Sequence, residues 1–339
     1  MIVLGIETSC DDTAAAVLDG PRLLSSIVSS QDAVHGPYGG IVPELASRHH
    51  LVNVLAVLHA ALEQAGIGID AVEGIAVTRG PGLIGSLLVG LSTAKGIAFR
   101  RGIPMVGVNH LEGHLLAIFL EREIEFPYVA LLVSGGHTSL HLAEGPGRYR
   151  RLGATRDDAA GEAFDKAAKM LGLGFPGGRV IDRLARDGDR TAIRFPRAVV
   201  RGAKYDFSFS GLKTALREFL RREHGFAAGA QAPSLSASAL GDIAASFQEA
   251  VVDMLAVPAL AAADELGVPR IVVSGGVSAN SRLRGRLHDD ARRLGMAAYV
   301  PSPKLCTDNA AMIAYAGARR LANRERDPLT LNAVASLPL

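Results

Sequence analysis

Short apolar runs alternate along the chain with longer stretches in which apolar residues recur every three or four positions. The short runs predict β-strands, and the longer stretches predict amphipathic helices. Residues 1–8 and 128–133 each lead through a polar turn into a second apolar run, which predicts two β-hairpins of the same design. The other predicted elements are strands at residues 74–78 and 105–108, a strand with its turn at 270–277, and helices at 43–66, 86–99, 110–117, 161–171, 180–186, 210–222, 243–266 and 308–323.

The two hairpins, each followed by helices, indicate an internal duplication. A Val-Ser-Gly-Gly turn follows the strand of the second hairpin at residues 133–136, and it recurs at residues 273–276. We therefore expect an α/β fold with two lobes that face each other across a cleft. Open α/β sheets bind ligands at such positions, so the hairpin tips are expected to line the cleft.

Composition agrees with a globular protein. Of the 339 residues, 48% are hydrophobic and 21% are charged, a balance that supports a sizeable core. The chain has two cysteines, Cys10 and Cys306, too few and too far apart for a disulfide framework. The sequence starts directly with a predicted strand, and no apolar run is long enough to cross a membrane without a charge or a helix breaker. The prediction is a cytoplasmic protein that does not enter the membrane.

The formal net charge of +2 excludes a strongly basic protein, but the arginines are clustered. Any one cluster is typical of a solvated helix face. Several together indicate a surface that could bind a polyanion. The clusters lie at residues 100–101, 148–151, 217–222, 282–286 and 292–293.

The sharpest chemical pattern is the pair His110 and His114. Residues four positions apart on a helix differ by about 40° around its axis, so two imidazoles can share one cation. A metal site needs a third ligand, and Asp308 at the start of the last helix is the candidate. The structural alternatives are a helix N-cap for Asp308 and two partly buried histidines on an amphipathic helix.

A zinc peptidase would require His-Glu-x-x-His, with the glutamate directly after the first ligand. Here Glu112 is two residues after His110 and points about 200° away from it, which is a poor position for a general base. Cys10 could act as a nucleophile, although a cysteine in an apolar hairpin is more often packed. Arg48 to His50 interrupt the helical pattern and predict a charged surface turn.

Three glycine-rich turns could contact phosphate. Residues 80–85 match G-x-G-x-x-G after a strand, but the next strand ends in Asn109 rather than in an acidic residue, so a tight packing turn is favoured over a dinucleotide site. The two Ser-Gly-Gly turns let backbone N–H groups converge on an anion. Together they indicate a nucleotide between the lobes, and a Walker A motif is absent.

Taken together, these residues resemble the bacterial tRNA N6-adenosine threonylcarbamoyltransferase family, formerly labelled O-sialoglycoprotein endopeptidase. The resemblance extends from residue 1 to about residue 320. At Asp12 the family usually has Glu. The motifs that carry the resemblance are Gly5-Ile-Glu-Thr-Ser-Cys-Asp-Asp-Thr13, His110-Leu-Glu-Gly-His114, Leu132-Val-Ser-Gly-Gly-His-Thr138, Gly161-Glu-Ala-Phe-Asp-Lys166, Phe207-Ser-Phe-Ser-Gly-Leu-Lys-Thr214 and Val273-Ser-Gly-Gly-Val-Ser-Ala-Asn280.

The resemblance implies the duplicated actin-like, sugar-kinase and heat-shock ATPase fold. With it we expect lobe I at residues 1–109, with residues 310–339 packing back on it, and lobe II at residues 110–309. It implies that His110, His114 and Asp308 hold one Fe²⁺ or Zn²⁺, with Fe²⁺ preferred. It also implies a nucleotide-substrate site made of Val133, Ser134, Gly135, Gly136, His137, Asp165, Gly178, Asp182 and Asn280.

The implied reaction transfers the threonylcarbamoyl group of threonylcarbamoyl-adenylate to N6 of adenosine 37 in ANN-reading tRNAs, forming t6A. Asp11, at the first hairpin tip, is our hypothesis for the carboxylate that assists the amine. The resemblance further implies a paralogous actin-like subunit and a small ATPase as partners, and residues 85–98 either contact the paralogue or are buried within lobe I. The alternatives are a metal-dependent endopeptidase and a nucleotide-binding scaffold.

Overall fold

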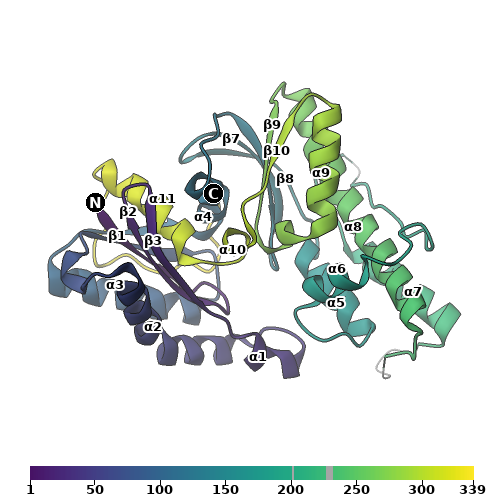
Figure 1. Cartoon of the computed structure of the whole chain (residues 1–339), viewed down its shortest axis with the longest axis horizontal. Helices are drawn as coiled ribbons and strands as arrows, with labels where there is room; N and C mark the ends of the chain where they lie inside the picture. The colour runs from purple at the N-terminus through teal and green to yellow at the C-terminus, as the bar shows by residue number, and fades with distance from the viewer. Residues whose placement is uncertain (201, 227–231) are drawn as a thin grey trace. The chain divides into compact units, whose positions relative to one another are not determined.

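The computed structural model describes residues 1–200, 202–226 and 232–339. It divides into two compact units, Met1–Ile124 with Pro303–Leu339, and Glu125–Ser302. Each unit contains one five-stranded sheet with helices packed on it (Figure 1). The two units are described separately below.

The first sheet has the order β3-β2-β1-β4-β5. β1, β2 and β3 are antiparallel neighbours, whereas β4 and β5 continue parallel to β1. The helices that surround this sheet include three that bear on the site: α3, α4 and α11. The strands are β1 (Ile2–Glu7), β2 (Thr13–Asp19), β3 (Arg22–Ser29), β4 (Gly74–Gly80) and β5 (Met105–Asn109); the helices are α1 (Asp32–His35), α2 (Pro43–Ala65), α3 (Ile84–Arg101), α4 (His110–Leu116), α10 (Pro303–Cys306) and α11 (Ala310–Ala322), with 3-10 turns at Gly36–Tyr38, Ile69–Ala71 and Ala117–Leu120.

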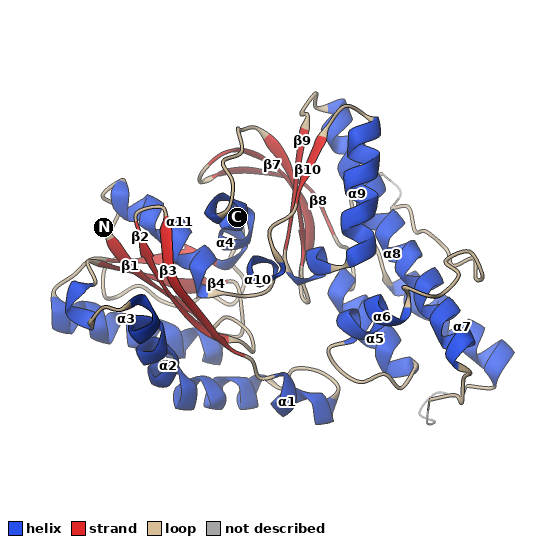
Figure 2. Cartoon of the chain, in the orientation of Figure 1, coloured by secondary structure: helices blue, strands red, loops and turns tan. Residues whose placement is uncertain are grey.

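Alternation along β1 explains why this sheet is covered on both faces. Leu4 and Ile6 pack with α2 and α3 in one apolar cluster, and Val3 packs with α11 in another. Figure 2 shows α2 and α3 on one side of the sheet and α11 on the other. A sheet buried on both faces explains why its strands appear in the sequence as continuous apolar runs.

The second sheet repeats the first, with the order β8-β7-β6-β9-β10. β6, β7 and β8 are antiparallel, and β9 and β10 are parallel to β6. The predicted duplication is therefore confirmed. The strands are β6 (Tyr128–Val133), β7 (Thr138–Gly145), β8 (Arg148–Ala154), β9 (Arg270–Ser274) and β10 (Ala297–Tyr299); the helices are α5 (Ala160–Met170), α6 (Gly177–Leu184), α7 (Ser210–His224), α8 (Ala237–Glu265) and α9 (Ser281–Arg293), with a 3-10 turn at Gly276–Ala279.

α8 forms the centre of the second unit. It continues through Pro258, and it starts before the predicted residue 243. By length and composition this helix could cross a membrane, but 78% of its most apolar window is buried in the fold. It packs Phe247 against the rings of Phe164 and Phe195, as expected of a core helix.

The bounds of the units differ from the predicted division at residues 109 and 310. Residues 110–124 belong to the first unit, because Leu116 and Ala117 pack with α11 in the same apolar cluster. Gly113 permits this packing, since a Cβ there would lie 2.9 Å from Ile313 Cδ1. Both histidines and Asp308 consequently lie in one unit.

Candidate functional site

The chemistry of the first unit is concentrated where the parallel strands β1 and β5 end. β5 ends at Asn109, whose side chain caps α4 by accepting a hydrogen bond from the N–H of Leu111 at 2.9 Å. This cap starts the helix at His110. The rings of His110 and His114 then lie one turn apart, with 4.7 Å between their centroids.

Asp308 joins the two histidines from the segment between α10 and α11. Its Oδ1 lies 3.1 Å from Nε2 of His114 and 3.6 Å from Nε2 of His110. The ligand atoms of the three residues all lie within 4.8 Å of one another. The N-cap of α11 is instead Asn309, which accepts from the N–H of Met312 at 3.0 Å, so the capping alternative for Asp308 is wrong.

Glu7 completes this cluster from the end of β1, a role that the sequence pattern did not predict. Its carboxylate is fully buried, and its Oε2 accepts from Nδ1 of His110 at 3.0 Å and from Oγ1 of Thr78 at 2.6 Å. Oε1 accepts from the N–H of Ser9. The sequence did contain a sign of this role. Glu7 ends an otherwise apolar strand, and a buried charge requires polar partners.

Glu7 and His110 each stabilise the charged form of the other. Burial alone would lower the pKa of His110, but the charges of Glu7 and Asp308 outweigh it and raise the pKa to about 9. Burial opposes the ionisation of Glu7, yet His110 brings the pKa of that carboxyl below its usual value. Burial lowers the pKa of His114, which favours a neutral ring.

This donor set fits a divalent transition metal. Two imidazole nitrogens and one carboxylate oxygen are ligands that suit Fe²⁺ or Zn²⁺. The Glu7 hydrogen bond occupies Nδ1 of His110, so Nε2, which faces Asp308, is the ring atom that could bind a metal after losing its proton, the pattern found for histidines that bind metals. Glu112 is not one of the three converging residues, so the geometry does not assemble a peptidase helix.

The acidic hairpin tip lies near the cluster. Burial, together with the charge of Asp308, raises the pKa of Asp11 and raises that of Asp12 to about 8. Burial and the charge of Asp11 also raise the pKa of the Cys10 thiol. A protonated thiol is a weak nucleophile, so the structure favours the packing role for Cys10.

His50 corrects the prediction of a charged surface turn at Arg48 to His50. α2 continues through these residues, and His50 is fully buried. Its Nδ1 lies 2.7 Å from Oγ1 of Thr13, and its Nε2 lies 3.0 Å from the carbonyl oxygen of Cys10. The imidazole therefore stabilises the hairpin tip through contacts on both ring nitrogens. The sequence did not indicate this role, because the neighbouring residues are polar and suggested a surface turn.

The G-x-G-x-x-G segment is a packing turn. A Cβ on Gly82 would lie 2.5 Å from the carbonyl oxygen of Ser9, and a Cβ on Gly90 would lie 2.4 Å from Oγ1 of Thr8. Glycine at these positions lets α3 and its preceding turn approach the end of β1. This agrees with the packing alternative favoured from the sequence.

In the second unit, the two Ser-Gly-Gly turns lie side by side. They follow β6 and β9, which pair Leu132 with Ser274. Gly275 has a φ of 90°, and a Cβ there would lie 2.4 Å from the carbonyl oxygen of Val133. The first turn is closed by the N–H of Ser134, which donates to the carbonyl of His137 at 2.8 Å.

The other residues predicted for the nucleotide site make hydrogen bonds at the starts of the helices α6 and α9. Oδ1 of Asp165 accepts from the N–H of Gly177 at 2.7 Å, next to Gly178 at the start of α6. Asp182 accepts from Oγ of Ser281 at 2.7 Å. Asn280 caps α9 through the N–H of Leu283, and its Nδ2 donates to Gln248 at 2.7 Å. Their role toward a nucleotide stays a prediction.

Solved structures similar to the whole chain share its fold. HypF from T. kodakarensis aligns with a TM-score of 0.60 at 14% identity, over 95% of this chain and 48% of HypF. The activator of the 2-hydroxyisocaproyl-CoA dehydratase from Clostridium difficile aligns with a TM-score of 0.52 at 15% identity, over 97% and 99% of the two chains. With the duplicated sheets, these similarities define an α/β protein of the actin-like ATPase fold class.

Sequence comparison identifies the family within that class. The model of the TsaD family, tRNA N6-adenosine threonylcarbamoyltransferase, matches residues 22–315. Proteins of that name are 53% identical in Geotalea uraniireducens, over 100% of this chain and 97% of theirs, and 56% identical in Anaeromyxobacter dehalogenans, over 98% and 97%. The chain belongs to this family. It is an acyltransferase that forms t6A on tRNA.

Proposed function

We propose that the chain transfers the threonylcarbamoyl group from threonylcarbamoyl-adenylate to N6 of adenosine 37 in ANN-reading tRNAs and releases AMP. The observation that carries this proposal is the convergence of His110, His114 and Asp308 beside the buried Glu7, in a chain of the transferase family. Glu112 is not part of this cluster, and this argues against the endopeptidase alternative.

The reaction exchanges one bond to the carbamoyl carbon for another. N6 of the adenosine forms a C–N bond, and the C–O bond to the adenylate phosphate breaks. AMP leaves with that oxygen, and N6 loses one proton. An exocyclic adenine amine is a weak nucleophile, so positioning of both substrates and removal of that proton are the tasks of the protein.

Three groups of residues would divide these tasks. The N–H groups of residues 134–137, with Asp165, Gly178, Asp182 and Asn280, would bind the adenylate, since glycine turns bring backbone donors close to a phosphate. His110, His114 and Asp308 would hold Fe²⁺ or Zn²⁺, which as a Lewis acid supplies stabilisation of developing negative charge. Asp11 would accept the proton from N6.

The acceptor adenosine is stacked in the anticodon loop, so it must leave the stack to react. The protein therefore has to bind the tRNA around it through the sugar–phosphate backbone. We place the protein in the cytoplasm, where its tRNA substrates are.

The paralogous partner would dock on a groove of about 390 Å³ between α2 and α3. Leu51, Leu55 and Leu88 line it and are 66%, 68% and 43% exposed. Of the small residues of α3, Gly90 and Ala94 are buried within the unit, whereas Ser92 and Thr93 line the groove. A paralogue of the same fold would carry an equivalent helix pair, and an exposed apolar groove is typical of such an interface. The small ATPase would act on that assembly, and a separate synthase would supply the adenylate.

One reconstitution tests the proposed function. The metal-loaded chain, its partner subunits, threonylcarbamoyl-adenylate and unmodified tRNA are incubated, and the digested nucleosides are analysed for t6A. We expect t6A and equimolar AMP from the wild type, and neither from His110→Ala, which should also lose metal in direct metal analysis. Peptide cleavage that chelators abolish, with no t6A, would support the endopeptidase instead. Adenylate binding without transfer would support the scaffold.

A further inference from the structure

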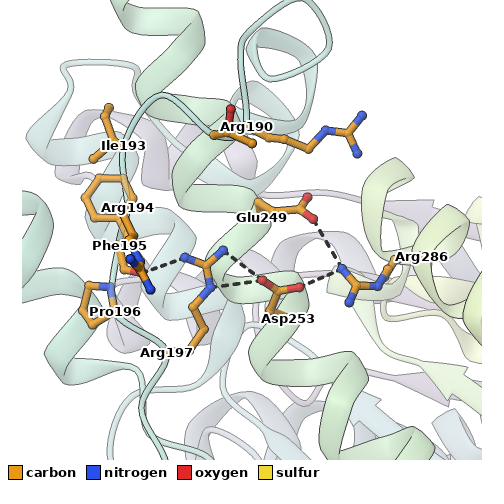
Figure 3. A pocket seen from close by; sticks show the side chains of 10 residues that line it. Arg190, Ile193, Arg194, Phe195, Pro196, Arg197, Glu249, Asp253 and Arg286 are labelled. Carbon is orange, nitrogen blue, oxygen red and sulfur yellow. Dashed lines mark hydrogen bonds and ion pairs between the residues drawn. The ribbon is translucent and has the colours of Figure 1, made fainter.

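A cavity of about 910 Å³ lies in the second unit, and the described residues that line it do not include the glycine turns. It is bounded by the segment after α6, by α8 and by α9, and Figure 3 shows the guanidinium groups around it. Four arginines and two carboxylates line it, a surplus of two positive charges. These charged residues are Arg190, Arg194, Arg197, Glu249, Asp253 and Arg286.

The carboxylates fix two of the four guanidinium groups. Oδ2 of Asp253 accepts from Nε and Nη2 of Arg197 at 3.0 and 2.8 Å, and Oδ1 accepts from Nη1 of Arg286 at 2.7 Å. Arg282, outside the cavity, pairs with Glu249 at 2.6 and 2.7 Å and holds the pKa of that carboxyl below its usual value. The charges of Glu249 and Asp253 are therefore engaged in holding arginines in place.

The other two arginines, Arg190 and Arg194, are exposed, and the described structure gives neither of them an ion pair. They stand on a segment that is anchored to α8. The ring of Phe195 is buried 5.9 Å from that of Phe247, and the N–H of Ile193 donates to Oγ of Ser246 at 3.1 Å. The pocket thus presents two exposed guanidinium groups, neither held in an ion pair by the described residues, on a segment that is anchored to α8.

We propose that this arginine pocket binds the phosphodiester backbone of the tRNA substrate, an inference that rests on the proposed function. Guanidinium forks match phosphate oxygens in pairs, and the surplus charge favours a polyanion. The one aromatic ring of the pocket, Phe195, is buried, so it offers no platform on which a base could stack. The contact would position the tRNA without reading its sequence.

α9 connects this pocket to the proposed adenylate site. Asn280 caps the helix, and Arg286 follows six residues later, which corresponds to about 9 Å along the helix axis. A tRNA strand held in the arginine pocket would therefore be held at a fixed offset from the adenylate turns. A fixed distance between the two sites would place one nucleoside of the tRNA at the adenylate while another part of the tRNA is held in the pocket.

The test compares two double variants of the full-length chain. Arg190→Gln with Arg194→Gln removes the unpaired charges of the pocket, and Arg122→Gln with Arg326→Gln removes two exposed arginines of the first unit that lie outside the arginine clusters. The dissociation constant of unmodified tRNA is measured by fluorescence anisotropy across salt concentrations. We expect the pocket variant to bind at least about tenfold more weakly and to lose about one unit of salt slope per arginine, with the control near wild type.

The outcomes separate this proposal from the proposed function. A pocket variant that binds tRNA as the wild type does, or a control that loses as much affinity, overturns the pocket while t6A formation by the wild type stands. The proposal is also overturned if the pocket binds AMP while the pocket variant binds tRNA as tightly as the wild type does. Arg190→Lys with Arg194→Lys should retain most of the salt slope, which excludes misfolding as the cause of the loss. Selective loss of tRNA affinity by the pocket variant, together with a wild type that forms no t6A, would support the pocket and refute the proposed function.

Discussion

Oε2 of Glu7 and Nδ1 of His110 lie 3.0 Å apart in a pair whose side chains are both buried. The pair joins the end of β1 to the start of α4, residues that are far apart in the chain. It sets the orientation of the His110 ring and supplies a negative charge behind it. The geometry of the metal-binding cluster therefore depends on a residue that would not touch the metal.

Glu7→Gln should weaken metal binding. The amide keeps a hydrogen-bond acceptor for Nδ1 of His110 but removes the charge, and loss of such a partner typically costs about 10- to 100-fold in metal affinity. Competition with a chromophoric chelator measures the affinity for Zn²⁺ directly. The exposed Glu44→Gln on α2 is the matched control. Equal affinity of Glu7→Gln and the wild type would contradict a supporting role.

Asp11→Asn should leave adenylate binding intact and lower the rate of transfer by about a hundredfold or more. The matched control is Asp12→Asn, because burial raises the pKa of Asp12 to about 8 and its carboxyl is already mostly protonated at neutral pH. Isothermal titration with a stable adenylate analogue measures binding, and single-turnover t6A formation measures transfer. Loss of adenylate binding in Asp11→Asn would refute the assignment.

Gly161→Ala should disturb the first Ser-Gly-Gly turn. A Cβ there would lie 2.6 Å from the carbonyl oxygen of Ser134 and 2.7 Å from Cα of Gly135, so the turn must move. We expect about tenfold weaker adenylate binding with unchanged metal affinity, since the metal-binding residues lie in the other unit. Gly211→Ala on α7, with open space around its Cβ, is the control. Unaltered adenylate affinity would argue that the turn does not bind the nucleotide.

Leu55→Glu, alone or with Leu88→Glu, should abolish binding of the paralogous subunit by placing charge in the groove between α2 and α3. Both side chains are exposed, so the chain itself should remain folded. Gel filtration of the mixed subunits checks the result. Leu294→Glu, at a leucine of the second unit that is 53% exposed, serves as the control. If the complex with Leu55→Glu stays intact, the interface does not lie in this groove.

The buried His141 of β7 should make the protein less stable in mild acid. Burial, and then Arg151, lower the pKa of His141 to about 4, whereas the unfolded chain titrates near 6.5. The unfolded state therefore binds the proton first, and the free energy of unfolding decreases as the pH falls from about 6.5 to 4. The contribution is about 2.5 kcal/mol at pH 4.5.

Urea unfolding at pH 7 and at pH 4.5 measures this loss, and His141→Gln should show correspondingly less of it. The comparison between the two proteins cancels the other groups that titrate in the same range. The same pH dependence in both proteins would mean that His141 is protonated at low cost in the folded state.

The repeated core of the fold could be predicted from the sequence, because β1, β4, β5, β6 and β9 are apolar runs with turn residues at their ends. The edge strands β3, β8 and β10 could not. β8 has the sequence RYRRLGA, and its arginines appeared as a charged cluster although they lie on a strand. Edge strands are often charged, which protects them from pairing with other chains and removes the apolar signal.

The site was predictable where chemistry follows local spacing. His110 and His114 are four residues apart, and a helix alone brings them together. Asp308 could be proposed but not distinguished from a cap, since Asn309 beside it has the side chain that caps. Glu7 and His50 escaped detection because their partners, at the ends of strands and helices remote in sequence, are fixed only by tertiary packing.

The first unit is discontinuous, since Met1–Ile124 is joined to Pro303–Leu339 only after the whole of the second unit. A nascent chain emerging from the ribosome thus presents both imidazoles long before the carboxylate of Asp308 is synthesised. The complete coordination sphere becomes available only once translation has passed the second unit and α11 has docked on the first sheet. An ion that requires all three side chains would therefore bind only to a chain whose synthesis has passed Asp308.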